Sequence, residues 1–98
     1  MLIVFTTVPD KDSARTLAEK IVGSRIAACV QILPRMTSVY LWNGEMREED
    51  EHLLLIKTLP AKYDELEKFI AANHSYEVPE IAAVDAAKVS EGYSKWLD

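Results

Sequence analysis

Apolar residues along the chain occur in two kinds of pattern, dense short blocks and stripes with helical spacing. Residues 2–7 form a block of apolar and β-branched side chains, which predicts a strand. In the next segment apolar residues recur at intervals of three and four, which predicts an amphipathic helix. We expect Asp10 or Asp12 to cap this helix and Gly23 to end it with a positive φ angle.

The middle of the chain predicts a long β-hairpin. Residues 26–33 are almost continuously apolar, as expected for a strand that is covered on both faces. Pro34 interrupts this run, and residues 37–42 resume it with β-branched and aromatic side chains. The Asn43–Gly44 pair indicates a two-residue turn, because both central residues of that turn need positive φ. The return strand is expected over residues 45–58.

The last third of the chain predicts a helix, a strand and a second, short helix. The first helix begins at Pro60, where a missing amide hydrogen costs nothing. Residues 81–86 indicate a core strand, and Ser90 can cap the terminal helix. The resulting order is that of an α+β protein, a ferredoxin-like βαββαβ sandwich with a C-terminal helix. We expect one domain over residues 1–98.

The hairpin is too long for a domain of this size. Residues 25–42 would span roughly 60 Å if extended, whereas a globule of this length has a radius of gyration of about 13 Å. The hairpin must therefore bend at Pro34 or project, and its distal part carries large apolar groups such as Leu41 and Trp42. Because exposed hairpins of this kind aggregate, we expect other copies of the chain to cover it. The alternative is a monomer with a curled hairpin.

Charge and composition exclude several classes of partner. The net charge is −5 and the basic residues are scattered, which argues against nucleic-acid binding. No apolar run approaches the ~20 residues of a membrane span, and the first residues lack the pattern of a signal peptide. The single cysteine, Cys29, excludes an internal disulfide and favours a reducing compartment, so we expect a cytoplasmic protein.

Six segments together resemble the CutA family of divalent-ion tolerance proteins. They are Thr6–Pro9 and residues 25–32, 38–45, 53–58, 74–81 and 93–97. The resemblance implies a single CutA-like domain that assembles as a homotrimer. It also implies a role in tolerance of divalent metal ions, copper above all.

Two further functions remain as alternatives. The expected trimer also resembles the nitrogen-regulatory signalling trimers, so one alternative is a sensor that binds a small metabolite in clefts between subunits. That likeness is one of fold alone. An enzyme that pairs His74 with Glu77 or Glu80 as acid and base is the weakest hypothesis, because no nucleophile motif or glycine-rich phosphate loop occurs. We therefore expect a non-enzymatic protein.

The resemblance also points to candidate metal ligands. In some family members a cysteine near the end of the first strand and two adjacent histidines bind the metal. The matching residues here are Thr6, Asn73 and His74, so only the last is retained. His74 and the nearby Glu77 are candidate ligands, although a histidine at a helix end can also act as a cap.

Two other residue types can bind metal. Cys29 is a candidate thiolate ligand, with a buried inert thiol as the alternative. The acidic run over residues 45–51 can hold a hard cation such as calcium or magnesium, but a solvated hairpin tip explains it better. His52 is interpreted as a surface residue.

Aromatic and charged residues of the family-like segments form a second candidate site. If a trimer forms, they are expected to converge on a cleft between subunits and bind a small anionic or zwitterionic ligand. The alternative is that they anchor the subunit interface, where aromatic residues are enriched. The candidates are Trp42, Lys57, Tyr76, Glu80 and Trp96, with Tyr40 beside them.

Overall fold

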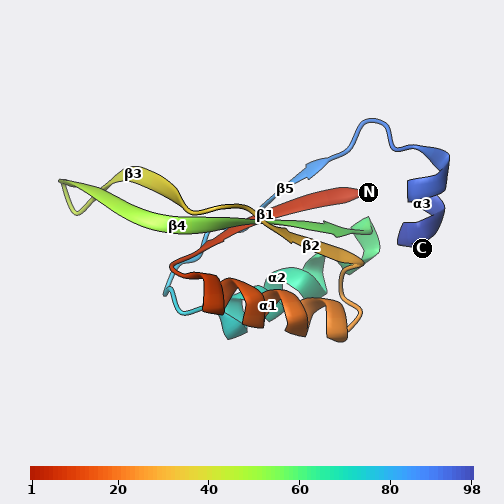
Figure 1. Cartoon of the computed structure of the whole chain (residues 1–98), viewed down its shortest axis with the longest axis horizontal. Coiled ribbons are helices and arrows are strands. Elements are labelled where there is room, and N and C mark those ends of the chain that lie inside the picture. Colours follow the sequence, from red (N-terminus) through yellow and green to blue (C-terminus); the bar gives the residue numbers. More distant parts are fainter.

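Five strands and three helices follow one another in the order that the sequence predicts (Figure 1). The computed structural model describes all 98 residues. The elements are β1 (Leu2–Val8), α1 (Lys11–Gly23), β2 (Cys29–Ile32), β3 (Met36–Trp42), β4 (Glu45–Thr58), a 3₁₀ turn (Pro60–Lys62), α2 (Tyr63–Asn73), β5 (Ala82–Asp85) and α3 (Glu91–Leu97). This confirms the α+β, ferredoxin-like architecture.

The strands form an antiparallel sheet in the order β2–β4–β1–β5, and β3 pairs with the first half of β4. Helices α1 and α2 lie against one face of this sheet (Figure 1). Because strand side chains alternate between faces, Val4 of β1 and its partner Ile56 of β4 both point toward the helices. The core between the layers includes Val4, Leu17, Ile21, Leu54, Ile56, Leu66 and Ile70.

The sheet face opposite α1 and α2 carries large apolar side chains that remain half-exposed. Phe5 and Leu55 are cross-strand partners on this face, and Ile3 lies beside them. The edge strand β5 is exposed at all four positions, and Val84 is 50% exposed. The expectation that this last strand is a core strand is therefore wrong for the single chain, because all four residues of β5 are exposed and the strand pairs only with β1.

A one-residue bulge bends the long hairpin. Ile32 pairs with Leu54, but the next pair is Met36 with Glu51, so three residues of one strand oppose two of the other. Pro34 lies within the bulge, where its missing amide hydrogen interrupts no ladder bond. The predicted bend at this proline thus takes the form of a bulge between β2 and β3.

His52 fixes the bulge from the opposite strand. Its side chain donates from Nδ1 to the Leu33 carbonyl oxygen at 2.9 Å, next to the backbone bond from Leu33 N–H to Leu53 O. His52 is only 8% exposed, so its interpretation as a surface residue is wrong. The bulge leaves a carbonyl without a ladder partner, and the imidazole supplies one.

Two other local expectations need correction. The positive φ angle after α1 occurs at Arg25, with φ of 60°, whereas Gly23 is the last helical residue. The apolar run 26–33 is not a fully covered strand, because in its strand portion, β2, Gln31 is exposed and the other three residues are only partly buried. Ile26 is buried before the strand begins.

The Asn43–Gly44 turn has positive φ at both residues, as predicted.

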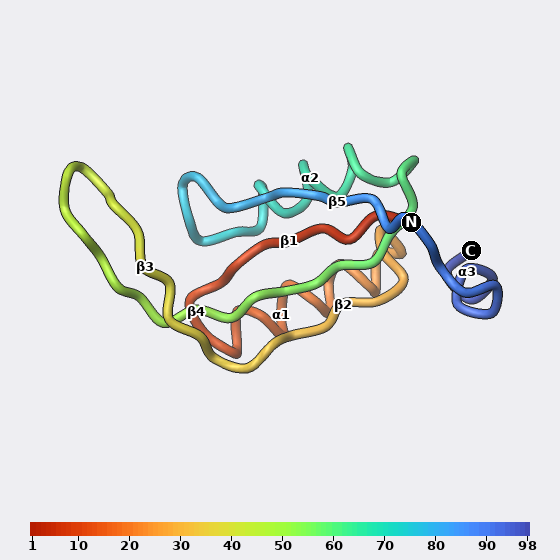
Figure 2. Tube along the Cα trace, turned by 90° about the horizontal axis from the view of Figure 1, so that it is seen from above, coloured from red at the N-terminus to blue at the C-terminus, as the bar shows by residue number.

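Beyond the bulge, β3 and the facing half of β4 form an arm, defined here as residues 36–51. The arm extends past the ends of α1 and α2 in both views, and the chain measures 45 × 25 × 23 Å (Figures 1 and 2). One face of the arm carries Val39, Leu41 and Met46, which are 58%, 69% and 73% exposed. Such a face is unusual on the surface of an isolated chain.

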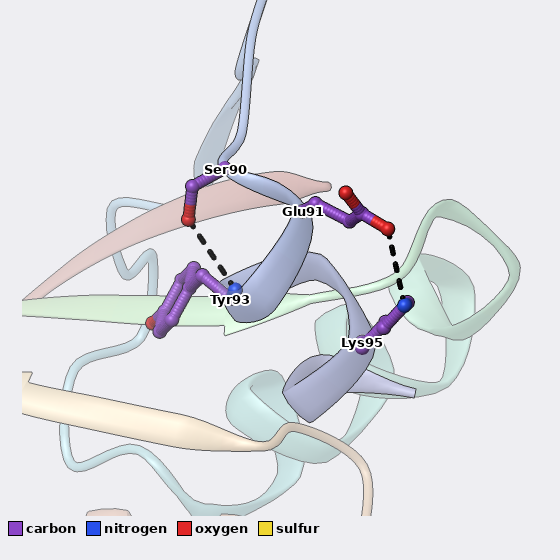
Figure 3. Close-up of polar contacts among 4 residues, drawn as sticks. All are labelled: Ser90, Glu91, Tyr93 and Lys95. Atoms are coloured by element: carbon purple, nitrogen blue, oxygen red, sulfur yellow. Dashed lines mark hydrogen bonds and ion pairs between the residues drawn. The ribbon is translucent and has the colours of Figure 1, made fainter.

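The C-terminal helix α3 is short and has one capping hydrogen bond and one ion pair between its turns. Ser90 accepts a hydrogen bond from the Tyr93 backbone N–H at 3.3 Å, and Lys95 pairs with Glu91 at 3.1 Å (Figure 3). Asp10 caps α1 in the same way, since its carboxylate accepts from Ser13 N–H at 2.7 Å. None of the three helices is both long and apolar enough to cross a membrane.

Candidate functional site

A groove lies between the arm and the segment that follows α2. It has a volume of about 540 Å³ and is termed the arm groove below. Three aromatic side chains, Tyr40, Trp42 and Tyr76, line it. Its charged lining consists of Arg47, Glu49, Glu51, Glu77 and Glu80.

Strand register explains which arm residues line the groove. Tyr40 pairs with Arg47, and Trp42 pairs with Glu45 across the turn, so these side chains share one face of the arm. Glu51 lies further along β4 on that same face, because it is an even number of residues from Arg47. The exposed apolar residues described above occupy the opposite face. The arm therefore has one aromatic, acidic face and one apolar face.

Tyr76 and Glu51 join the two walls of the groove. The Tyr76 hydroxyl donates to Glu51 Oε2 at 2.9 Å. Burial, and then the adjacent Glu51 carboxylate, raise the pKa of Tyr76 well above its ordinary value, so the phenol remains a donor at neutral pH. Glu51 is only 8% exposed and takes part in none of the four ion pairs of the chain.

His74 anchors the segment that carries Tyr76. Its Nε2–H donates to the Thr7 carbonyl oxygen at 2.6 Å, and its Nδ1 accepts from the Tyr76 backbone N–H at 3.0 Å. His74 is also the residue at which α2 ends, with an extended backbone. Both ring nitrogens are thus occupied by hydrogen bonds, which requires a neutral imidazole.

The sequence-predicted cleft residues do not all meet within one chain. Trp42, Tyr76 and Glu80 line the arm groove together. Lys57 lies elsewhere, on β4 near the far end of the sheet, where it donates to Gln31 Oε1 at 2.6 Å. Trp96 lies on α3 and stacks on Tyr93, with 5.7 Å between ring centroids.

The three candidate metal ligands do not form one cluster within the chain. Glu77 lines the arm groove, His74 ends α2, and Cys29 pairs with Lys57 on the sheet. Cys29 is half-buried and free. No three His, Cys, Asp or Glu side chains of the chain are grouped to hold a metal ion.

Arg47, Glu49 and Glu51 are groove residues that the sequence reasoning missed, since the acidic run was interpreted as a solvated tip. The Asn43–Gly44 turn offered a usable signal. It fixes the hairpin register, and the register puts every second residue of the run on the face of Tyr40 and Trp42.

Comparison with known proteins agrees with this fold. The model of a family described as CutA1 divalent ion tolerance protein matches residues 2–98. The divalent-cation tolerance protein CutA of Thermus thermophilus is 44% identical over 97% of this chain and 92% of its own length. The solved Thermus thermophilus structure superposes with a TM-score of 0.94, at 44% identity over 99% of this chain and 95% of its own.

More distant relatives differ in length and in the compartment that their names give. Protein CutA of Arabidopsis thaliana, named as chloroplastic, is 40% identical over 98% of this chain, which spans about half (53%) of that relative's length. A solved structure from Archaeoglobus fulgidus, named as periplasmic, is 26% identical with a TM-score of 0.94, covering 99% of this chain and 95% of its own.

The fold and the groove define a small α+β domain of the ferredoxin-like class, with a projecting hairpin and a helix-free sheet face. The family match covers almost the whole chain, and several relatives exceed 30% identity. The chain belongs to the CutA1 divalent ion tolerance protein family.

Proposed function

We propose that the chain works as a non-enzymatic homotrimer in the tolerance of divalent metal ions. The exposed apolar face of the arm carries this proposal, because Val39, Leu41 and Met46 need cover that the chain does not provide. The half-exposed sheet face around Phe5 and Leu55 supports it as well. The proposed number of subunits, three, rests on the family resemblance of the sequence.

We propose further that divalent cations, copper foremost, bind weakly where subunits meet. Since Cys29, His74 and Glu77 form no cluster within one chain, ligands from two copies would have to combine. Imidazole and thiolate suit copper better than carboxylate does. Weak binding is expected because coordination through His74 Nδ1 would displace its hydrogen bond from Tyr76 N–H.

Titration of Cu²⁺ into the purified protein, followed by calorimetry, tests the metal proposal. The variants are Cys29→Ala, His74→Ala and Glu77→Gln, and Glu65→Gln on the outer face of α2 is the charge-matched control. The proposal predicts that Cu²⁺ binding to the wild type is saturable. At least one of the three ligand variants should bind Cu²⁺ more weakly, whereas the control should bind it as the wild type does. Absence of binding at micromolar Cu²⁺ would overturn it, and equal binding by all variants would exclude these ligands.

We place the protein in the cytoplasm. The single free cysteine supports this location, because a reducing compartment preserves thiols. Fractionation of the cells that produce the protein would test it, and recovery from an oxidising compartment would contradict it.

A sensor that binds a small metabolite is the second candidate function. The arm groove favours it, because its volume of about 540 Å³ falls in the range of small-molecule sites. A ligand selective for the folded state would raise the thermal midpoint by mass action. A broad metabolite screen without any shift would count against this function.

A further inference from the structure

We propose that the arm groove binds a small organic cation, a ligand that carries an ammonium or guanidinium group. This inference rests on the sensor function proposed above and names the chemical class of its ligand. It does not depend on metal binding, and it requires only residues of one chain. Charge, aromatic surface and one uncompensated buried carboxylate carry the argument.

The charge of the groove favours a cation. Glu49, Glu51, Glu77 and Glu80 line it together with a single basic residue, Arg47. Arg47 lies 4.0 Å from Glu45, which is on the same face of the arm and partly offsets its charge. Lys57, the one basic residue behind the expectation of an anionic or zwitterionic ligand, lies elsewhere on the sheet. Four carboxylates against one guanidinium repel an anion and attract a cation.

The buried carboxylate of Glu51 lacks a counter-charge. The residue is 8% exposed and lines the groove, yet its one hydrogen-bond partner is the neutral Tyr76 hydroxyl, at Oε2. A buried carboxylate is costly unless a cation pairs with it. A ligand ammonium or guanidinium group that reached Glu51 would supply this partner through a charge-assisted hydrogen bond.

The aromatic lining indicates an organic cation in preference to a bare metal ion. Trp42 and Tyr40 come from the arm and Tyr76 from the opposite wall, and Trp42 is 52% exposed, so its ring is accessible. Aromatic faces attract organic cations and contact their hydrocarbon parts at the same time. A metal ion would need several convergent donors, and no such group of side chains exists here.

Calorimetric titration with four small probes tests the proposal. The probes are cadaverine, which carries two ammonium groups, the neutral diol 1,5-pentanediol and the anion glutarate; agmatine adds a guanidinium group. Binding of cadaverine or agmatine, weakened by added salt, is expected because charge drives it. Neither the diol nor glutarate is expected to bind. Equal binding of all probes, or no binding of either amine at millimolar concentration, would overturn the proposal.

Variants locate the site. Glu51→Gln is expected to weaken amine binding about tenfold or more, because it removes the buried charge but keeps an acceptor for Tyr76. Trp42→Ala is expected to weaken it about threefold, and the change removes no core contact because Trp42 lies outside the hydrophobic core. Glu65→Gln is the charge-matched control and should not alter binding. Unchanged affinity in both groove variants would overturn the assignment.

A lysine or arginine of a second copy is the competing source of the same cationic group. Sedimentation of the groove variants distinguishes the two. If Glu51→Gln or Trp42→Ala dissociates the assembly while no free amine binds the wild type, a neighbouring subunit fills the groove, and the proposal is overturned. Failure of Cu²⁺ binding or of trimer formation, with amine binding intact, would affect only the proposed metal function.

Discussion

Thr6 combines complete burial with a hydroxyl that has no hydrogen-bond partner. Replacing it with valine keeps the side-chain shape and removes a desolvated polar group. We therefore predict that Thr6→Val raises the free energy of unfolding by about 1 kcal/mol. Denaturant titration at a fixed protein concentration would measure the change.

Thr58 provides the matched control for this prediction. It is also buried, but its hydroxyl donates to the Ile26 carbonyl oxygen at 2.7 Å. Thr58→Val should lower the free energy of unfolding by about 1–2 kcal/mol, because it leaves that carbonyl unpaired. Changes of the same sign in both variants would contradict this account of Thr6.

Tyr76 should make stability depend on alkaline pH. Its pKa is raised by folding above the unfolded value of about 10. Its contribution is therefore fully present below pH 10 and is lost as pH rises toward the folded pKa. We predict that wild type loses more unfolding free energy above pH 10 than Tyr76→Phe, in denaturant titrations across that range. Parallel loss in the two proteins would contradict the prediction, since Tyr40 and Tyr63, whose pKa values are also raised, remain in both.

Some residue roles were predictable from local rules, and others depended on distant partners. The caps at Asp10 and Ser90 and the turn at Asn43 follow from side-chain chemistry within a few residues. His52 and Glu51 could not be assigned in this way, because their partners, Leu33 and Tyr76, lie 19 and 25 residues away. Burial of a polar residue depends on such contacts.

At the scale of elements, the bulge between β2 and β3 sets the direction of the arm. His52 holds it through the Leu33 carbonyl oxygen. We predict that His52→Ala lowers the free energy of unfolding by about 2 kcal/mol, since it leaves a half-buried acceptor unpaired. His52→Gln, which keeps an N–H donor, should lose less. A His52→Ala protein as stable as wild type would show that the bulge does not need this contact.

Element types and order were predictable, whereas the cover of the edge strands was not. Periodicity separates helix from strand and the Asn43–Gly44 turn fixes the register, so the βαββαβ order follows from the sequence. Apolar composition was interpreted as cover on both faces for residues 26–33 and as a core strand for residues 81–86. In the single chain β2 and β5 are edges, because only β4 and β1 pair with them.

At the scale of the whole molecule, the apolar surface that the single chain leaves exposed has one consistent explanation. The exposed face of the arm, the half-exposed sheet face and the exposed strand β5 all lie outside the core that α1 and α2 cover. Hydrophobic surface of this extent is stabilised by removal from water. The proposed trimer would provide that removal.

Sedimentation equilibrium of the wild-type protein at micromolar concentration tests this claim most directly. The account predicts one species with three times the 11.1 kDa mass of the chain, without detectable dissociation. A stable species of 11.1 kDa at that concentration would contradict it, because the apolar face of the arm would then be exposed to water in the native state.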